Sequence, residues 1–182
     1  MKLRADLEII SHWIRPNSRV LDLGCGDGTL LKYLQEFQGV SGYGIEIDSE
    51  NIIHCIDNDV DVIQNDIENG LLDFDEDSFD YVLMTQTLQS MQNPVKIIQE
   101  MLRIGRESII TFPNFGHWRC RFSLFFNGEM PVSRALPYQW YDTPNIHLCT
   151  LRDFERICCQ NRFRIMQRSV VDHTHQESMP IK

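Results

Sequence analysis

The segment Val-Leu-Asp-Leu-Gly-Cys-Gly-Asp-Gly, residues 20–28, is the most informative part of this sequence. It places three glycines at alternate positions, where a short apolar run ends and a helical pattern with Leu30, Leu31 and Leu34 begins. Glycine permits a tight turn there and lets a ligand lie against bare backbone. In open α/β sheets, ligands bind at this carboxyl edge of the strands. The segment therefore predicts a strand, a ligand-binding turn and a helix.

Strand and helix patterns alternate on both sides of this segment. Apolar residues at helical spacing predict an N-terminal helix within residues 1–17, a helix after Ser49 as its N-cap, and a helix over Val95–Ile104 after Pro94. The predicted strands are Val20–Leu23, Gly42–Ile47, Val60–Gln64, Phe79–Thr85 and Ser108–Phe112. Strands separated by helices pair in parallel through right-handed crossovers. We expect a doubly wound, mostly parallel, Rossmann-like α/β sheet in a single domain over residues 1–182.

The alternation lapses between Phe112 and His147, where aromatic residues and prolines concentrate. Residues 113–147 are interpreted as an aromatic-rich lid or interface segment. Helix resumes at Thr-Leu-Arg-Asp, residues 150–153, which has the form of a capping box. A last strand is predicted over Arg164–Val171, followed by a flexible polar tail over residues 172–182, too short to complete the sheet, whose final edge strand is therefore expected to be missing.

Composition excludes several classes of function. The formal net charge of −9, with no local cluster of lysine and arginine, argues against a nucleic-acid partner. The N-terminus lacks a signal pattern and no apolar run has membrane length, so we expect a cytoplasmic protein without a membrane partner. The six cysteines form no C-x-x-C pair and are expected to be reduced thiols.

Two carboxylates stand at the end of the second predicted strand. Glu46 is placed to accept hydrogen bonds from the two adjacent hydroxyls of a ribose. Asp48 is the rival for this role, although we expect it to serve the N-terminus of the next helix together with Ser49. A dinucleotide loop of the form G-x-G-x-x-G needs glycine at position 29, where this chain has Thr29. An NAD-dependent oxidoreductase is therefore disfavoured.

The loop resembles the first signature of class I S-adenosylmethionine-dependent methyltransferases, D/E-x-G-x-G-x-G. The resemblance implies that S-adenosyl-L-methionine, or its product S-adenosyl-L-homocysteine, is the cofactor. It also implies an acid near the adenine amino group and an apolar residue against the ring, although an aspartate at a strand end is also an ordinary turn residue. The predicted cofactor-binding residues are Asp22, Gly24, Cys25, Gly26, Gly28, Glu46, Ile47, Asp66 and Ile67.

A closer resemblance runs from the first residue to about Val171. The segments Tyr43-Gly-Ile-Glu-Ile-Asp48, Ile110-Thr-Phe-Pro-Asn-Phe-Gly-His-Trp-Arg-Cys-Arg121 and Trp140-Tyr-Asp-Thr-Pro-Asn-Ile-His147 are similar to those of the MetW family of methionine biosynthesis. That resemblance implies an auxiliary role, as a partner of homoserine O-acyltransferase of the MetX type. The alternative is an autonomous small-molecule methyltransferase whose acceptor enters beneath the aromatic segment.

Tryptophan, tyrosine and arginine are enriched in interface hot spots. The predicted partner or substrate surface therefore comprises Trp118, Arg119, Arg121, Trp140 and Tyr141. The competing interpretation is that the aromatic residues fill the core beneath a long loop.

No catalytic base can be named. The Asn-Pro-Pro-Tyr element of amino-group methyltransferases is absent after the fourth strand, where Thr85-Gln86-Thr87 stands, and loop histidines such as His117 and His147 more often serve structural hydrogen bonds. No metal site is predicted: the acidic run at residues 73–77 lacks the glycine and glutamate of a calcium loop, and the histidines at 173 and 175 lack a third ligand.

Overall fold

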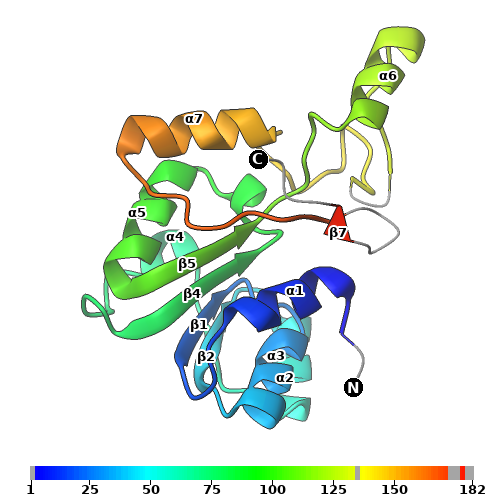
Figure 1. The fold of residues 1–182 in the computed structure, drawn as a ribbon. Coiled ribbons are helices and arrows are strands. Elements are labelled where there is room, and N and C mark those ends of the chain that lie inside the picture. Colours follow the sequence, from blue (N-terminus) through cyan, green and yellow to red (C-terminus); the bar gives the residue numbers. More distant parts are fainter. Residues whose placement is uncertain (1–2, 134–135, 172–176, 179–182) are drawn as a thin grey trace. The chain divides into compact units, whose positions relative to one another are not determined.

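Strands and helices alternate along the first 111 residues in the computed structural model of the chain (Figure 1). The structure describes residues 3–133, 136–171 and 177–178. The chain forms two compact units, unit 1 over residues 1–111 and unit 2 over residues 112–182.

Unit 1 carries the α/β pattern. Its elements are α1 (Ala5–Trp13), β1 (Arg19–Leu23), α2 (Thr29–Gln38), β2 (Ser41–Glu46), α3 (Ser49–Asp57), β3 (Val62–Gln64), α4 (Ile67–Gly70), β4 (Phe79–Thr85), the 3₁₀ turn η1 (Leu88–Ser90), α5 (Pro94–Ile104) and β5 (Gly105–Thr111).

The five strands form one parallel sheet in the order β3-β2-β1-β4-β5, which confirms the predicted doubly wound sheet. Leu23 of β1 lies opposite Ile45 of β2, and Asp22 lies opposite Leu83 of β4. The chain moves outward from β1 to β3 and then returns to the other side of β1 at β4. The carboxyl ends of β1 and β4 therefore flank the switch point of the topology, where such sheets bind ligands.

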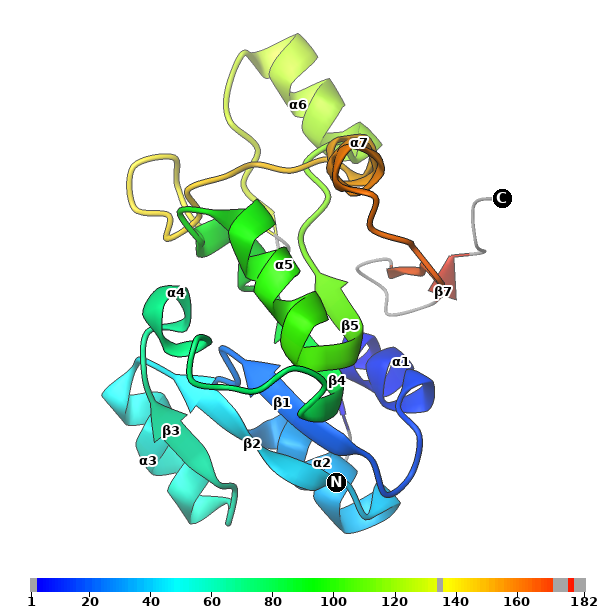
Figure 2. The ribbon, with the colours of Figure 1, turned by 90° about the vertical axis from the view of Figure 1, so that its left-hand side faces the viewer.

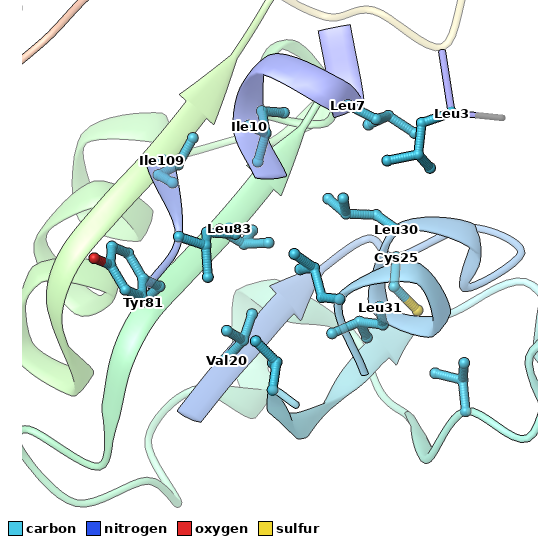
Figure 3. Packing of buried hydrophobic residues seen from close by; sticks show 14 of the residues in the cluster. Leu3, Leu7, Ile10, Val20, Cys25, Leu30, Leu31, Tyr81, Leu83 and Ile109 are labelled. Carbon is cyan, nitrogen blue, oxygen red and sulfur yellow. The ribbon is translucent and has the colours of Figure 1, made fainter. Parts of the chain in front are cut away.

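Helices cover both faces of this sheet (Figure 2). On one face, α1, α2 and α3 pack with β1 and β4 around a core that includes Val20, Leu31 and Leu83 (Figure 3). On the other, α5 packs on β4 and β5 through its buried residues Ile97, Ile98, Met101 and Ile104. Strands covered on both faces are largely apolar, in agreement with the unbroken burial of β1 from Val20 to Leu23, in which Asp22 is the one charged residue.

Three predicted details of unit 1 are corrected. The N-cap of α3 is Asp48, whose carboxylate accepts hydrogen bonds from the backbone amides of Glu50 and Asn51, both at 3.0 Å. This confirms that Asp48 serves the N-terminus of the next helix, whereas Ser49 is the first helical residue and not the cap. The third strand is shorter than predicted, and the fifth begins at Gly105 rather than Ser108, directly after α5.

Unit 2 contains α6 (Trp118–Asn127), α7 (Leu151–Asn161) and an antiparallel pair, β6 (Val170–Val171) with β7 (Glu177–Ser178). The predicted capping box at the start of α7 is confirmed, with Thr150 and Asp153 exchanging hydrogen bonds. Phe112 packs on Phe154 of α7 with ring centroids 4.9 Å apart, and the amide of Phe115 donates to the carbonyl of Cys149 at 3.0 Å. These contacts fix the start of unit 2 to its second helix.

The prediction of a strand over Arg164–Val171 is wrong for most of its length, because only Val170 and Val171 pair with another strand among the described residues. Helix α6 lies within the segment predicted to be irregular. The predicted tail, residues 172–182, lies outside the described residues except for positions 177 and 178. In the part of the chain that the structure describes, no helix is long and apolar enough to cross a lipid bilayer.

Candidate functional site

The glycine loop follows β1 directly and lies at the switch point of the sheet in unit 1. The amides of Gly24 and Cys25 both donate to the carbonyl of Ile45 in β2, at 2.8 and 3.3 Å. The loop then enters α2, whose N-cap is Gly28. The signature residues predicted from the sequence are thus brought together at one edge of the sheet.

The glycines of the loop have different surroundings. A Cβ added to Gly24 would lie 2.7 Å from the hydroxyl of Thr87, the residue that follows β4 by two positions. A Cβ added to Gly26 would meet no atom within 4 Å, although its φ of +56° lies in the left-handed region. Gly24 therefore allows the segment after β4 to approach the loop. Gly26 presents bare backbone to open space, as a bound ligand requires.

Glu46, at the end of β2, holds this loop through its carboxylate. Its Oε2 accepts a hydrogen bond from the amide of Gly26 at 2.9 Å, and its Oε1 accepts from the amides of Ile47 and Asp48 at 2.9 and 3.0 Å. The side chain is buried. A carboxylate has about four acceptor positions. Glu46 therefore keeps capacity for one ligand hydroxyl, and for a second if the Gly26 amide is released.

Asp22 is the most unusual polar group of the site. It is 1% exposed, and its Oδ1 has no hydrogen-bond partner among the described residues. Burial raises the pKa of Asp22 from 3.8 to about 7, and the negative charge of Glu46 contributes to this rise. An unpaired carboxylate is costly to bury. The position therefore favours a ligand that brings a positive charge or a hydrogen-bond donor.

Two cysteine thiols, those of Cys25 and Cys55, pack together at the glycine loop. The Sγ atom of Cys55, on α3, donates to the carbonyl of Gly26 at 3.1 Å and lies 3.8 Å from the Sγ atom of Cys25. Burial raises the pKa of both thiols. All six cysteines are free, in agreement with the prediction of reduced thiols.

The predicted adenine side shows one exposed and one buried apolar residue. Ile47, next to Glu46, is 64% exposed, whereas Ile67 is 7% exposed. Asp66 is the N-cap of α4 and accepts a hydrogen bond from the amide of Glu68 at 3.0 Å. The exposed side chain of Ile47 is the better placed of the two apolar residues to contact a ligand.

The predicted surface residues lie in two parts of unit 2. Trp118, Arg119 and Arg121 are on α6, whereas Trp140 and Tyr141 form a separate exposed pair with ring centroids 5.7 Å apart. They do not fill a core within this unit.

Sequence reasoning missed several residues that shape the loop. Thr87 packs against Gly24, and the side chain of Asn58 donates to the carbonyl of Asp27 at 2.9 Å. Gln89 of η1 is 7% exposed and its Oε1 has no partner among the described residues, while Gln86 adopts a φ of +55° just after β4. Backbone strain of this kind concentrates at functional sites. No role was predicted for either glutamine, and only the folded chain shows the burial of Gln89 and the positive φ of Gln86.

Comparison with solved structures finds the same fold in proteins described as methyltransferases. A methyltransferase dependent on S-adenosylmethionine from Archaeoglobus fulgidus matches with a TM-score of 0.67 and 18% identity, covering 86% of this chain and 66% of that one. The plantazolicin methyltransferase BpumL, solved in complex with SAH, matches with a TM-score of 0.60 and 20% identity, covering 87% of this chain and 60% of that one. At sequence identities of 18% and 20%, the structural similarity shows a shared fold.

Sequence comparison is more specific. The model of the family described as methionine biosynthesis protein MetW matches residues 4–182. The bifunctional methionine biosynthesis protein MetXA/MetW of Rhodopirellula baltica is 37% identical over 160 residues, which cover 83% of this chain and 26% of that protein. This chain therefore spans about a quarter of the length of its relative. Together these matches show that the chain belongs to the MetW family of methionine biosynthesis proteins.

Proposed function

We propose that unit 1 binds S-adenosyl-L-methionine, or S-adenosyl-L-homocysteine, at the glycine loop, and that the chain acts as the partner of a homoserine O-acyltransferase in methionine synthesis. The observation that carries the nucleotide proposal is the buried carboxyl group of Asp22, whose Oδ1 has no partner among the described residues, together with the open backbone of Gly26. S-adenosylmethionine carries an ammonium and a sulfonium, which suit a negatively charged loop. A pyrophosphate would be repelled by the same charges.

The roles of the residues follow from their surroundings. Gly26 lets the methionine part of the nucleotide lie against the chain, and Asp22 receives its ammonium group. Glu46 accepts the ribose hydroxyls, with release of the Gly26 amide when both are bound. Ile47 contacts the adenine ring, Ile67 supports it from a more buried position, and Asp66 accepts from the adenine amino group.

When bound, S-adenosylmethionine supplies an electrophilic methyl group. An acceptor that needs deprotonation would require a base beside it. The segment at the end of β4, Thr85-Gln86-Thr87, carries no titratable side chain. The Nδ1 atom of His117, the N-cap of α6, accepts a hydrogen bond from the amide of Arg119 at 3.4 Å. These residues favour an auxiliary binding role over autonomous methyl transfer.

The partnership is supported by the bifunctional relative, in which a MetW part and a MetXA part are named within one protein. A covalent link keeps two domains at high effective concentration. Where the MetW part is a separate chain, a direct interface would serve the same purpose. Nucleotide binding would regulate the acyltransferase if it favoured one state of that interface, because coupling between two sites is reciprocal.

Two measurements test the proposal. Isothermal titration of the full chain with S-adenosylmethionine, S-adenosylhomocysteine and NAD should give binding of the first two only, weakened by Glu46→Gln. Co-purification with the homoserine O-acyltransferase, followed by acyl-transfer assays with and without this chain, should give a complex and an increase in activity. Absence of both complex and activation would refute the partnership, and methyl transfer to a metabolite would favour an autonomous methyltransferase instead.

A further inference from the structure

Helix α6 presents four aromatic side chains on one face. Trp118, Phe122 and Phe125 recur at intervals of four and three residues, and Phe126 follows Phe122 by four, so all four lie along the same side of the helix. We call this set the α6 aromatic face. Its members are 58%, 54%, 80% and 70% exposed, in chain order. The buried residue of the helix is Cys120, so the apolar face points away from the contacts of the helix.

The rings of this face pack on one another. Phe122 stacks on Phe126 with centroids 5.5 Å apart, Trp118 meets Phe122 edge to face at 5.9 Å, and Phe125 meets Phe126 edge to face at 5.0 Å. Side chains already held in place lose less rotamer freedom when a partner covers them. Aromatic residues with few rotatable bonds are the typical anchors of interfaces. The face is therefore preorganised for docking.

Two arginines border the aromatic face, and α6 has no acidic residue. The guanidinium of Arg119 lies over the ring of Trp118 at 5.3 Å, and Arg121 precedes Phe122. This local positive charge stands on a chain with a net charge of −9. A partner that carries acidic groups around an apolar groove would complement it.

The charges also discriminate between occupants. A second copy docking through the same helix would bring four arginines together with no acid on either helix, which is unfavourable for a symmetric contact. An anionic lipid surface would attract two arginines but repel the net charge of the chain. A protein with a local acidic rim avoids both costs.

We infer that the α6 aromatic face is the surface through which this chain docks onto an apolar groove with an acidic rim on the homoserine O-acyltransferase. This inference rests on the proposed partnership and identifies its contact surface. Phe125 serves as the central anchor, because it is the most exposed of the four rings. Arg119 and Arg121 set the orientation and speed the encounter.

The test measures binding of full-length variants to the homoserine O-acyltransferase by biolayer interferometry. Phe125→Ser should raise Kd at least about tenfold, as loss of a hot-spot ring does. The matched control is Phe37→Ser on α2, because Phe37 is 59% exposed and also packs on a neighbouring ring, that of Tyr33 at 4.7 Å. The control should leave Kd within about twofold.

Charge reversal gives a second, independent measurement. Arg121→Glu should lower the association rate and reduce its dependence on salt, whereas Arg152→Glu, an exposed arginine on α7, should change neither. Unchanged thermal midpoints and unchanged titration with S-adenosylhomocysteine show that the variants are folded and that unit 1 is intact.

The outcomes separate this inference from the function on which it rests. If the wild-type chain binds the acyltransferase and both Phe125→Ser and Arg121→Glu bind equally well, the docking face is wrong and the partnership stands. If the wild-type chain itself does not bind, the partnership fails and the docking face with it. Loss of self-association, or loss of binding to anionic vesicles, in Phe125→Ser without an effect on the acyltransferase would also overturn the inference.

Discussion

Replacing Asp22 by asparagine is expected to stabilise the ligand-free protein at alkaline pH and to have a much smaller effect in mild acid. Asp22 is buried with its Oδ1 unpartnered among the described residues, and burial together with Glu46 raises its pKa from 3.8 to about 7. The folded protein therefore holds a proton on Asp22 over a range of pH in which the unfolded chain has released it. Asparagine has a similar shape and cannot ionise, so it removes this dependence.

The sign and the magnitude follow from linkage. Because the folded state binds the proton more tightly, the free energy of unfolding falls as pH rises from about 4 to about 7 and then levels off. A rise of about three pH units corresponds to about 4 kcal/mol at full ionisation, at about 1.36 kcal/mol for each unit. Between about pH 5 and about pH 8 only about two of these three units develop, because the carboxyl group of the unfolded chain is already largely ionised at about pH 5; this part is about 2.5 kcal/mol. Water penetration and relaxation can only lower this figure.

The assay is urea unfolding of the ligand-free wild type and of Asp22→Asn at about pH 5 and about pH 8. The advantage of the variant should grow by up to about 2.5 kcal/mol between the two conditions. Asp61→Asn, which changes an exposed carboxylate on the same unit, serves as the control and should show no such growth. An advantage that is equal at the two pH values would contradict a raised pKa of Asp22 in the folded protein. The same asparagine variant should bind S-adenosylmethionine more weakly, since it lacks the negative charge that we propose receives the ammonium group.

Three further substitutions test other parts of the structure. Gly26→Ala should cost about 1 to 2 kcal/mol of stability because of its positive φ, and should abolish nucleotide binding in a calorimetric titration because its methyl group enters the open space above the loop. Asp48→Ala should lower the free energy of unfolding by about 1 kcal/mol in urea, whereas Ser49→Ala should leave it nearly unchanged, and the reverse order would contradict the assignment of the cap. Thr150→Ala should weaken α7 by about 1 kcal/mol, seen as faster amide hydrogen exchange in its first turn, and unchanged exchange there would contradict the capping box.

The sheet could be predicted from the sequence because its strands are buried on both faces. Val20–Leu23 and Phe79–Thr85 are largely apolar runs, and the helices between them carry stripes at helical spacing. The glycine loop was predictable because alternate glycines between a buried strand and a helix are typical of a ligand-binding turn. The cap of α3 was assigned one residue too late because Asp48 and Ser49 are both good caps, and only the geometry shows which side chain reaches the amides.

Helix α6 was not predicted from the sequence because its apolar face is exposed to solvent. Sequence periodicity identifies a helix by the stripe it buries, and here the stripe is exposed while aromatic residues have only moderate helix propensity. The signals that were present are its ends: His117 as N-cap and Gly128, with a φ of +68°, as C-cap. The strand predicted over Arg164–Val171 was wrong for a different reason. Its composition is typical of a strand, but composition does not supply a neighbouring strand with which to pair.

The contacts of the glycine loop also could not be predicted from the sequence. Glu46 was predicted to accept hydrogen bonds from a ligand. In the folded chain its carboxylate already accepts hydrogen bonds from three backbone amides. Thr87 and Asn58 belong to segments far from the loop in the sequence and meet it only through the order of the strands. Long-range side-chain contacts of this kind depend on the whole topology.

The pair of thiols beneath the glycine loop has a practical consequence. Cys25 and Cys55 are buried and their raised pKa values keep them protonated at neutral pH, so an alkylating reagent reacts with neither while the loop is closed. Each alkylation of Cys25 or Cys55 therefore records one opening of the loop. The rate of alkylation at these two positions, followed by mass spectrometry, measures how often the glycine loop opens.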